Sequence, residues 1–202
     1  DLLLQRSIQV AGGFEYRGWK RLRVRAQVFY SWMYDRIVGS GRVIEVFGKP
    51  QRENYNNNGT GRAYGLELQA NFQPTPFFAA ALACTFSRAE RGNLNSDTMS
   101  LYSYDQPHIL NLSARYLFGK GWSLSVRFRL VSGRPTRAIR GVFFDADRDR
   151  YIPMQGENGS ARYPTFHQLD VRIEKKWVFN LWKLAAYLDF QNVYFAQNAE
   201  AF

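Results

Sequence analysis

The 202-residue sequence predicts an all-β fold in which long antiparallel strands follow one another up and down in a single sheet. Apolar and polar residues alternate with a period of two along most of the chain, which is the pattern of strands with one apolar face. No segment of twelve or more residues places its apolar side chains at helical spacing. The connections between the predicted strands alternate strictly between short and long, as an up-and-down topology requires if only one end carries loops.

Eight strands are predicted, each bounded where Gly, Pro or charged residues interrupt the alternation. In the first two, Val10 and Val24 lie on an apolar face, opposite the face that carries Glu15 and Arg25. The third and fourth flank a turn with two prolines, which cannot donate hydrogen bonds within a sheet. The expected strands cover residues 7–17, 22–35, 62–72, 77–87, 108–117, 122–131, 166–177 and 182–194.

The last four predicted strands repeat the pattern most clearly. Leu112, Phe128 and Leu169 fall on the apolar face, while Arg127 and Arg172 fall on the polar one. Short turns are expected near residues 118–121 and 178–181. Three long connections, rich in Gly, Asn and charged residues, cover 36–61, 88–107 and 132–165.

Strand length and loop arrangement favour a membrane location. Most predicted strands have about ten residues or more, whereas strands of globular proteins have about 5–6. Outer-membrane barrels use strands of about 9–11 residues, with short turns at one end and long loops at the other. Aromatic residues also gather near strand ends, among them Tyr30, Trp32, Trp122 and Trp177. These features predict an antiparallel up-and-down transmembrane β-barrel segment.

Composition excludes several other classes. The formal net charge is +10, and aromatic residues make up 16% of the chain, far more than in a disordered tail. The longest apolar run, residues 77–84, is too short for a transmembrane helix. Cys84 is the single cysteine, so no disulfide framework is possible, and His108 and His167 are too few for a zinc cluster. We expect both histidines to form local hydrogen bonds at strand ends, and Cys84 to lie inert on the apolar face.

No catalytic motif is recognisable, so we expect neither an enzyme nor a cofactor. The basic residues alternate with apolar ones along the strands and form no separate patch. Nucleic-acid binding normally requires such a patch. No nucleic-acid partner is therefore expected.

Several segments resemble the barrel of TonB-dependent outer-membrane receptors. Residues 56–68 (NNNGTGRAYGLEL) resemble the family signature N-x-G-x-G-x-x-x-G-x-E, and residues 104–112 (YDQPHILNL) resemble its D-Q-P-H-x-L-N strand start. Residues 163–172 (YPTFHQLDVR) resemble P-x-F-x-Q-L-D-x-R, and residues 187–194 (YLDFQNVY) resemble the penultimate strand. Residues 4–14 resemble another strand start of the family. These matches follow the family order along nearly the whole chain.

The resemblance implies a 22-stranded barrel with a plug domain inside it, in the outer membrane of a Gram-negative bacterium. Residues 1–202 would then be a partial outer-membrane β-barrel of eight strands, with the plug domain and the final strand absent. Such receptors import scarce ligands, such as a siderophore, cobalamin, a glycan or a peptide, using energy from the TonB complex acting on the plug. The expected partners are outer-membrane lipid and lipopolysaccharide, the remainder of the barrel, the plug, the TonB complex and an unknown small ligand.

The polar face supplies the candidate site residues, because a charged side chain facing lipid at the midplane costs about 2–4 kcal/mol. In the resembled family this wall contacts the plug, and attraction of an anionic substrate is the alternative role. The lumen-facing, plug-contact candidates are Arg23, Arg25, Glu67, Arg115, Arg127, Arg129, Asp170, Arg172 and Asp189.

The longest connection is basic and also contains a weak calcium pattern. It could contact lipopolysaccharide phosphates or an anionic ligand, or simply be solvated, through Arg134, Arg137, Arg140, Arg148 and Arg150. Asp145, Asp147 and Asp149 have the spacing of calcium ligands. The Gly and Glu that complete such a loop are missing, so ion pairs with the neighbouring arginines are the favoured interpretation.

Two alternatives from other classes remain open at this point. A self-contained eight-stranded outer-membrane barrel with a structural or adhesive role would close on itself. A soluble β-sandwich binding module would instead bury the apolar face under a second sheet.

Overall fold

The structure is a computed structural model that describes residues 2–18, 21–94 and 99–198. Eight long strands form one continuous antiparallel sheet in the order β1-β2-β5-β6-β8-β9-β14-β15. Their bounds are β1 Arg6–Gly18, β2 Leu22–Gly39, β5 Tyr55–Thr75, β6 Phe78–Asn93, β8 His108–Gly119, β9 Trp122–Val131, β14 Phe166–Val178 and β15 Lys183–Phe190. All eight predicted strands are therefore present, and each pairs with its neighbour in the chain.

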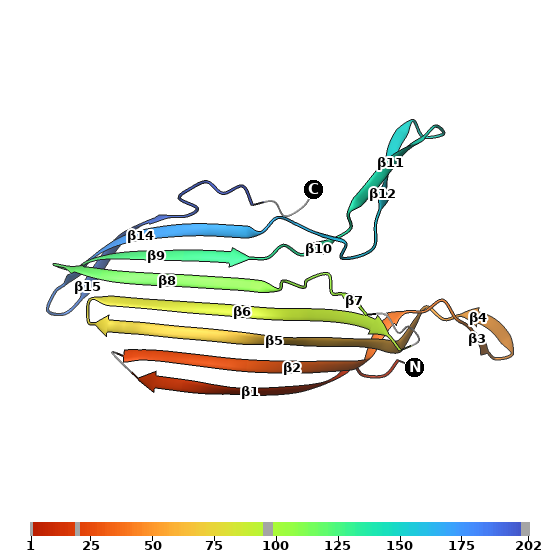
Figure 1. Ribbon diagram of the computed structural model, residues 1–202, viewed down its shortest axis with the longest axis horizontal. Coiled ribbons are helices and arrows are strands. Elements are labelled where there is room, and N and C mark those ends of the chain that lie inside the picture. The colour runs from red at the N-terminus through yellow and green to blue at the C-terminus, as the bar shows by residue number, and fades with distance from the viewer. Residues whose placement is uncertain (1, 19–20, 95–98, 199–202) are drawn as a thin grey trace.

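The sheet is a single curved layer with two unlike ends (Figure 1). The short turns lie at one end of the strands, and the long connections lie at the other, as the sequence predicts. No helix of the described residues is long and apolar enough to cross a membrane.

The long connections contain strands that sequence reasoning missed. β3 (Val43–Val46) pairs with β4 (Lys49–Arg52), β11 (Ile139–Asp145) with β12 (Arg150–Gln155), and β10 (Pro135–Thr136) with β13 (Ala161–Arg162). The two-residue turn of the first hairpin explains its formation, because Phe47 and Gly48 both have positive φ, at 50° and 72°. Such turns match the twist of paired strands. β7 (Ser100–Leu101) adds a short pair to β6.

Four predicted strand boundaries are wrong by four residues or more, and one of them is the end of β2, which lies at Gly39 rather than at residue 35. β5 begins seven residues before the predicted position, at Tyr55, and β6 continues to Asn93, so both extend beyond the predicted wall. The last strand ends at Phe190 rather than near Tyr194. It ends there because Asn192 adopts a positive φ of 52°, and its side chain bonds the backbone N–H and carbonyl of Ala196.

One face of the sheet is apolar, and nothing in the described chain covers it. Register places Val24, Ala70, Leu82, Leu112, Phe128 and Leu169 in one row across six strands. Among the apolar residues of the described ranges, only Val131 is buried, with 5% of its surface exposed. The sheet therefore has no conventional core.

The sheet arrangement also bears on the two alternative folds. A closed eight-stranded barrel requires hydrogen bonds between its first and last strands. In the described residues β1 and β15 each pair with one neighbour only. A sandwich requires a second layer against the apolar face, and the other paired strands are only short hairpins in the connections. Neither alternative fits this structure.

Candidate functional site

The polar face collects all nine of the predicted lumen-facing residues. Across the middle of the sheet, Arg23 opposes Asn71, and the same row continues through Ala81 and Ser113 to Arg127 and Asp170. Adjacent rows contain Arg25 with Arg129, Arg115 with Arg172 and Asp189, and Glu67. Directly opposed residues in a sheet lie on the same face. These residues therefore form one surface, opposite the apolar row.

Asp170 is the centre of the best-connected group on this surface. One carboxylate oxygen accepts from Nε and Nη2 of Arg127, at 3.1 and 2.7 Å. The other accepts from Gln168 at 2.7 Å and from the backbone N–H of Asn192 at 3.1 Å. Asp170 is buried, whereas 65% of the Arg127 side chain remains exposed. The guanidinium is thus oriented by Asp170 yet open to a further partner.

Other ion pairs extend this surface toward the short turns and toward β1. Glu174 lies 3.7 Å from Arg115 and 3.1 Å from Arg172. Glu15 accepts from Arg25 at 2.7 Å and lies 3.7 Å from Arg23. In the described part of the chain, Glu67, Arg129 and Asp189 form no ion pair. The charged candidates thus differ in how much of their hydrogen-bonding capacity is already used.

A hollow of about 460 Å³ opens on the polar face. Its floor consists of small side chains, Ala79, Ala81, Ser113 and Ser125, and charged side chains stand around it. The charged set comprises Arg115, Arg127, Arg172, Asp170 and Asp189. The hollow offers both space and charge-assisted hydrogen bonds to whatever the polar face contacts.

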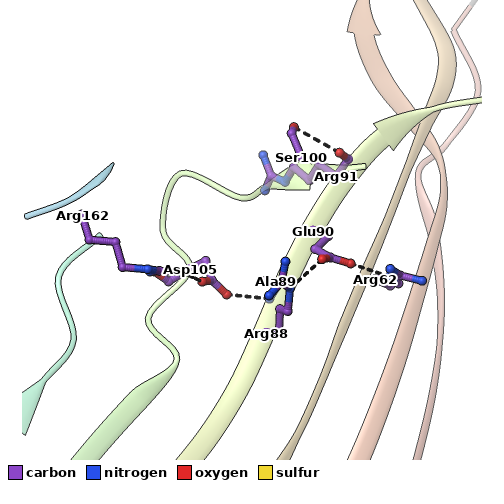
Figure 2. A network of polar contacts seen from close by, with 8 residues as sticks. All are labelled: Arg62, Arg88, Ala89, Glu90, Arg91, Ser100, Asp105 and Arg162. Carbon is purple, nitrogen blue, oxygen red and sulfur yellow. Dashed lines mark hydrogen bonds and ion pairs between the residues drawn. The ribbon is translucent and has the colours of Figure 1, made fainter. Parts of the chain in front are cut away.

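A second centre, here called the rim lock, lies at the base of the long connections and consists of Asp105, Arg162, Ala89 and Gly133. Figure 2 shows Asp105 between Ala89, whose N–H donates at 2.7 Å, and Arg162, whose Nη2 donates at 2.6 Å. Nη1 of Arg162 also donates to the carbonyls of Asp105 at 3.0 Å and Gly133 at 3.1 Å. Asp105 is only 2% exposed. One carboxylate therefore joins three segments that are far apart in sequence.

Glu90 forms a third centre near the lock, also visible in Figure 2. It is 7% exposed and accepts from Nε of Arg62 and Nε of Arg88, each at 2.6 Å. Register places this group on the apolar face, where Arg88 opposes Tyr64, and Arg62 and Glu90 form the next row outward. The rings of Tyr30 and Tyr64 stack 6.1 Å apart. The apolar face thus ends in an aromatic pair followed by charge.

The five arginines of the predicted basic loop do not form one patch. Arg148 lies 3.4 Å from Asp145 at the tip of the β11–β12 hairpin, and Arg150 opposes the same aspartate in register. Arg137 donates to Gln155 at 3.3 Å, and Arg140 is exposed on β11. Arg134 lies apart, near the rim lock, with its Cζ 4.9 Å from the ring centre of Tyr104.

The weak calcium candidate finds no support in the geometry. Asp145 accepts from the backbone N–H of Asp147 at 3.2 Å and pairs with Arg148. No group of three His, Cys, Asp or Glu side chains in the described ranges could hold a metal ion, so Asp149 does not complete a site with the other two. Of the histidines, His167 contacts the Tyr194 hydroxyl at 2.7 Å, and His108 packs edge-on against Phe86.

A sequence comparison identifies the protein family of this chain. A family model described as "TonB dependent receptor-like, beta-barrel" matches residues 4–193. The chain belongs to this family. A comparison with curated protein sequences found no match.

Solved structures of three transporters share the fold. The outer-membrane transporter YddB from Escherichia coli superposes with a TM-score of 0.62 at 17% identity, over 97% of this chain and 29% of that one. The FrpB iron transporter from Neisseria meningitidis gives 0.62 at 18% identity, over 94% and 27%. The copper transporter OprC gives 0.59 at 21% identity, over 96% and 26%. The receptor-family chain thus spans little more than a quarter of these proteins.

Sequence reasoning missed the rim lock and the Glu90 centre of this receptor-family wall. Asp105 stands inside the D-Q-P-H segment used for the resemblance, which is a usable signal for a structural role. Glu90 has one nearby partner, Arg88, two residues away on the same strand. Arg162 and Arg62 carry no such signal, because they lie 57 and 28 residues from their partners Asp105 and Glu90. Only the fold brings these pairs together.

Proposed function

We propose that this chain is part of the barrel wall of a TonB-dependent transporter in the outer membrane of a Gram-negative bacterium. The transporter imports a scarce ligand, such as a siderophore, cobalamin, a glycan or a peptide. The long connections around β3–β4, β7 and β11–β12 contribute to its external opening. The neighbours named as iron and copper transporters support a scarce nutrient as cargo.

The observation that carries the proposal is the uncovered apolar face. A soluble protein rarely exposes an apolar area of this extent, whereas a barrel wall presents it to lipid. β5 has 21 residues, about twice the length that crosses a bilayer, so it continues into the external medium. Tyr30 and Tyr64 would then lie at the outer interface, where Arg62 and Arg88 would contact lipopolysaccharide or lipid headgroups.

The polar face supports the second part of the proposal, contact with a plug domain of the same protein. Arg127 is fixed by Asp170 on one side and exposed on the other. The nearby hollow provides room for a plug segment. The TonB complex would act through that plug, and the remainder of the barrel would pair with the free edges of β1 and β15.

Topology and transport can be tested separately in the whole protein. We expect an epitope inserted after Asp147 to be cleaved by protease added to intact cells, and one inserted after Lys120 to be protected. Cells that carry the gene should deplete a solute from the medium, detected by mass spectrometry, only when TonB is functional. Reversed protection would contradict the orientation, and depletion without TonB would contradict the transport class.

A further inference from the structure

A second hollow, of about 320 Å³, lies on the polar face where β9 and β14 meet the long connections. We call it the rim pocket. Its polar lining comes from Arg129 on β9, Arg134 before β10, Gln106, Ser132 and Tyr163. Phe166, at the start of β14, forms one apolar wall. The rim pocket therefore combines two cations with hydroxyl and amide groups at the external end of the wall.

Charge in the rim pocket is unbalanced. None of the described residues that line it is acidic. Within the described ranges, neither Arg129 nor Arg134 forms an ion pair. The nearest carboxylates are already engaged, since Asp105 is bound by Arg162 and Asp170 by Arg127. Among the residues that the structure describes, a bound anion would therefore meet two unpaired positive charges in one hollow and no opposing carboxylate.

Each of the two arginines also lies over an aromatic ring. The Cζ of Arg129 lies 5.8 Å from the ring centre of Phe166, and the Cζ of Arg134 lies 4.9 Å from that of Tyr104. An aromatic ring attracts a cation that lies over its face. The five N–H donors lie in the guanidinium plane and can form the paired bonds that carboxylates and phosphates accept.

The backbone around the rim pocket is held in place by the rim lock. The N–H of Tyr163 donates to the carbonyl of Arg134 at 3.0 Å, and Arg162 bonds the carbonyl of Gly133. A Cβ on Gly133 would lie 1.7 Å from the carbonyl oxygen of Tyr163, so only glycine permits this approach. The site is thus built on fixed backbone rather than on a loop tip.

We propose that the rim pocket is an oxyanion subsite, in which Arg129 and Arg134 bind a carboxylate or phosphate group of the imported ligand. This inference rests on the proposed function and adds the chemical class of the ligand. The polar face points away from the lipid-facing side, so the anion arrives from solution and not from a lipopolysaccharide headgroup.

The test uses the purified whole receptor in detergent, with citrate and inorganic pyrophosphate as probes in calorimetric titrations. We expect R129Q/R134Q to weaken binding of at least one probe by about tenfold or more, and R129K/R134K to restore part of it. R148Q/R150Q is the matched control, because it also removes two positive charges, from the β11–β12 hairpin, and it should bind as the unaltered receptor does. Heat-dependent gel mobility verifies that each variant is folded.

Two results would overturn the oxyanion subsite. The first is absence of binding of both probes to the unaltered receptor at millimolar concentration. The second is an equal loss of affinity in R148Q/R150Q, which would indicate general charge attraction only. Lipopolysaccharide is titrated in parallel, and loss of its binding in R129Q/R134Q with anion binding intact would assign the two arginines to a lipid instead.

Failure of the subsite is distinguishable from failure of the proposed function. If TonB-dependent depletion of the solute persists unchanged in R129Q/R134Q, the transporter assignment stands and the subsite is wrong. If no TonB-dependent depletion occurs even in the unaltered receptor, the transporter assignment itself is wrong.

Discussion

The wall and the rim each hold an Arg–Asp pair of nearly the same length. Arg127 and Asp170 lie 2.7 Å apart on adjacent strands of the wall, and Arg162 and Asp105 lie 2.6 Å apart at the rim. The arginine of the wall pair is 65% exposed, and that of the rim pair 31%. At the rim Arg162 also bonds two carbonyls, so its donors are largely used. At the wall Arg127 keeps donors for a partner.

This difference in exposure indicates that the two Arg–Asp pairs have different roles. Strands of the wall are already joined by backbone hydrogen bonds, so Arg127 adds little to holding them together. The rim segments have few backbone hydrogen bonds to one another, and the Asp105 carboxylate joins them through Ala89 and Arg162 instead. The rim pair is therefore expected to matter most for structure, and the wall pair for contacts with another domain.

Removing the rim carboxylate should give the largest effect. In D105N, the partly exposed Arg162 loses its counterion, and the buried position 105 loses a charge-assisted hydrogen bond, which together should cost about 2–3 kcal/mol. The fraction of molecules in which the long connections are open should then rise steeply. These connections cover residues 88–107 and 132–165. We expect external protease to cleave these segments in whole cells at least about tenfold faster, because cleavage follows the open population.

The matched control for the rim is D147N, which removes an exposed carboxylate from the hairpin tip. It should leave the cleavage rate outside that hairpin unchanged. If external protease cleaves these segments equally fast in D105N and D147N, the rim lock does not hold the long connections closed.

Gly133→Ala should give the next largest effect. Its new methyl group would overlap the Tyr163 carbonyl, so the backbone must shift, at a cost of about 1–3 kcal/mol. Thermal unfolding of the whole receptor should show a lower midpoint, and the rim pocket should lose affinity for its probe. Gly41→Ala is the control, because a Cβ there meets no atom within 4 Å. Equal midpoints for both variants would count against close packing at the rim.

Arg127→Gln should change the barrel little and the plug contact more. Buried Asp170 loses its counterion but keeps its bonds from Gln168 and Asn192, so we expect a loss of about 1–2 kcal/mol in barrel stability. If the plug contacts this arginine, it should fit more loosely, and cells should admit more of a bulky dye that the closed barrel excludes. Dye entry equal to that of R148Q would indicate that Arg127 does not contact the plug.

The eight wall strands could be predicted because one physical rule governs them. Alternation with a period of two fixed which side of the sheet Arg23, Arg127 and Asp189 occupy, and register shows them on one face. Alternation is not expected where both faces of a strand are exposed to water, as in β3–β4 and β11–β12, so these strands could not be recognised by it. There a turn such as Phe47-Gly48 determines the fold, and the expectation of plain loops was wrong.

The sequence was sufficient to predict which residues belong to the candidate site, but not which of them pair with one another. Sequence reasoning grouped Arg134 with Arg148 because they share one loop. The fold instead places Arg134 beside Arg129, on a strand that precedes that loop, while Arg148 pairs with Asp145. Pairings across 28 or 57 residues depend on strand register and on loop closure, which no local pattern encodes.

The smallest expected effect concerns the β3–β4 hairpin, which has no counterpart to the rim lock. Glu53 accepts hydrogen bonds from Ser40 and from Asn56, and these hold the pKa of its carboxyl below the ordinary 4.5. A lowered pKa means that the folded hairpin favours the charged form. Its contribution to stability is therefore complete above pH 4.5 and is lost as the pH falls through the lowered pKa.

Amide hydrogen exchange of residues 40–56 in the whole receptor, followed from neutral to acidic pH, measures this contribution. We expect protection in this segment to fall slightly on acidification in the unaltered protein and to change less in Glu53→Gln, which cannot titrate. The rim segments, whose lock does not involve Glu53, should behave identically in both. An equal pH response of the hairpin in the two proteins would show that Glu53 does not hold it.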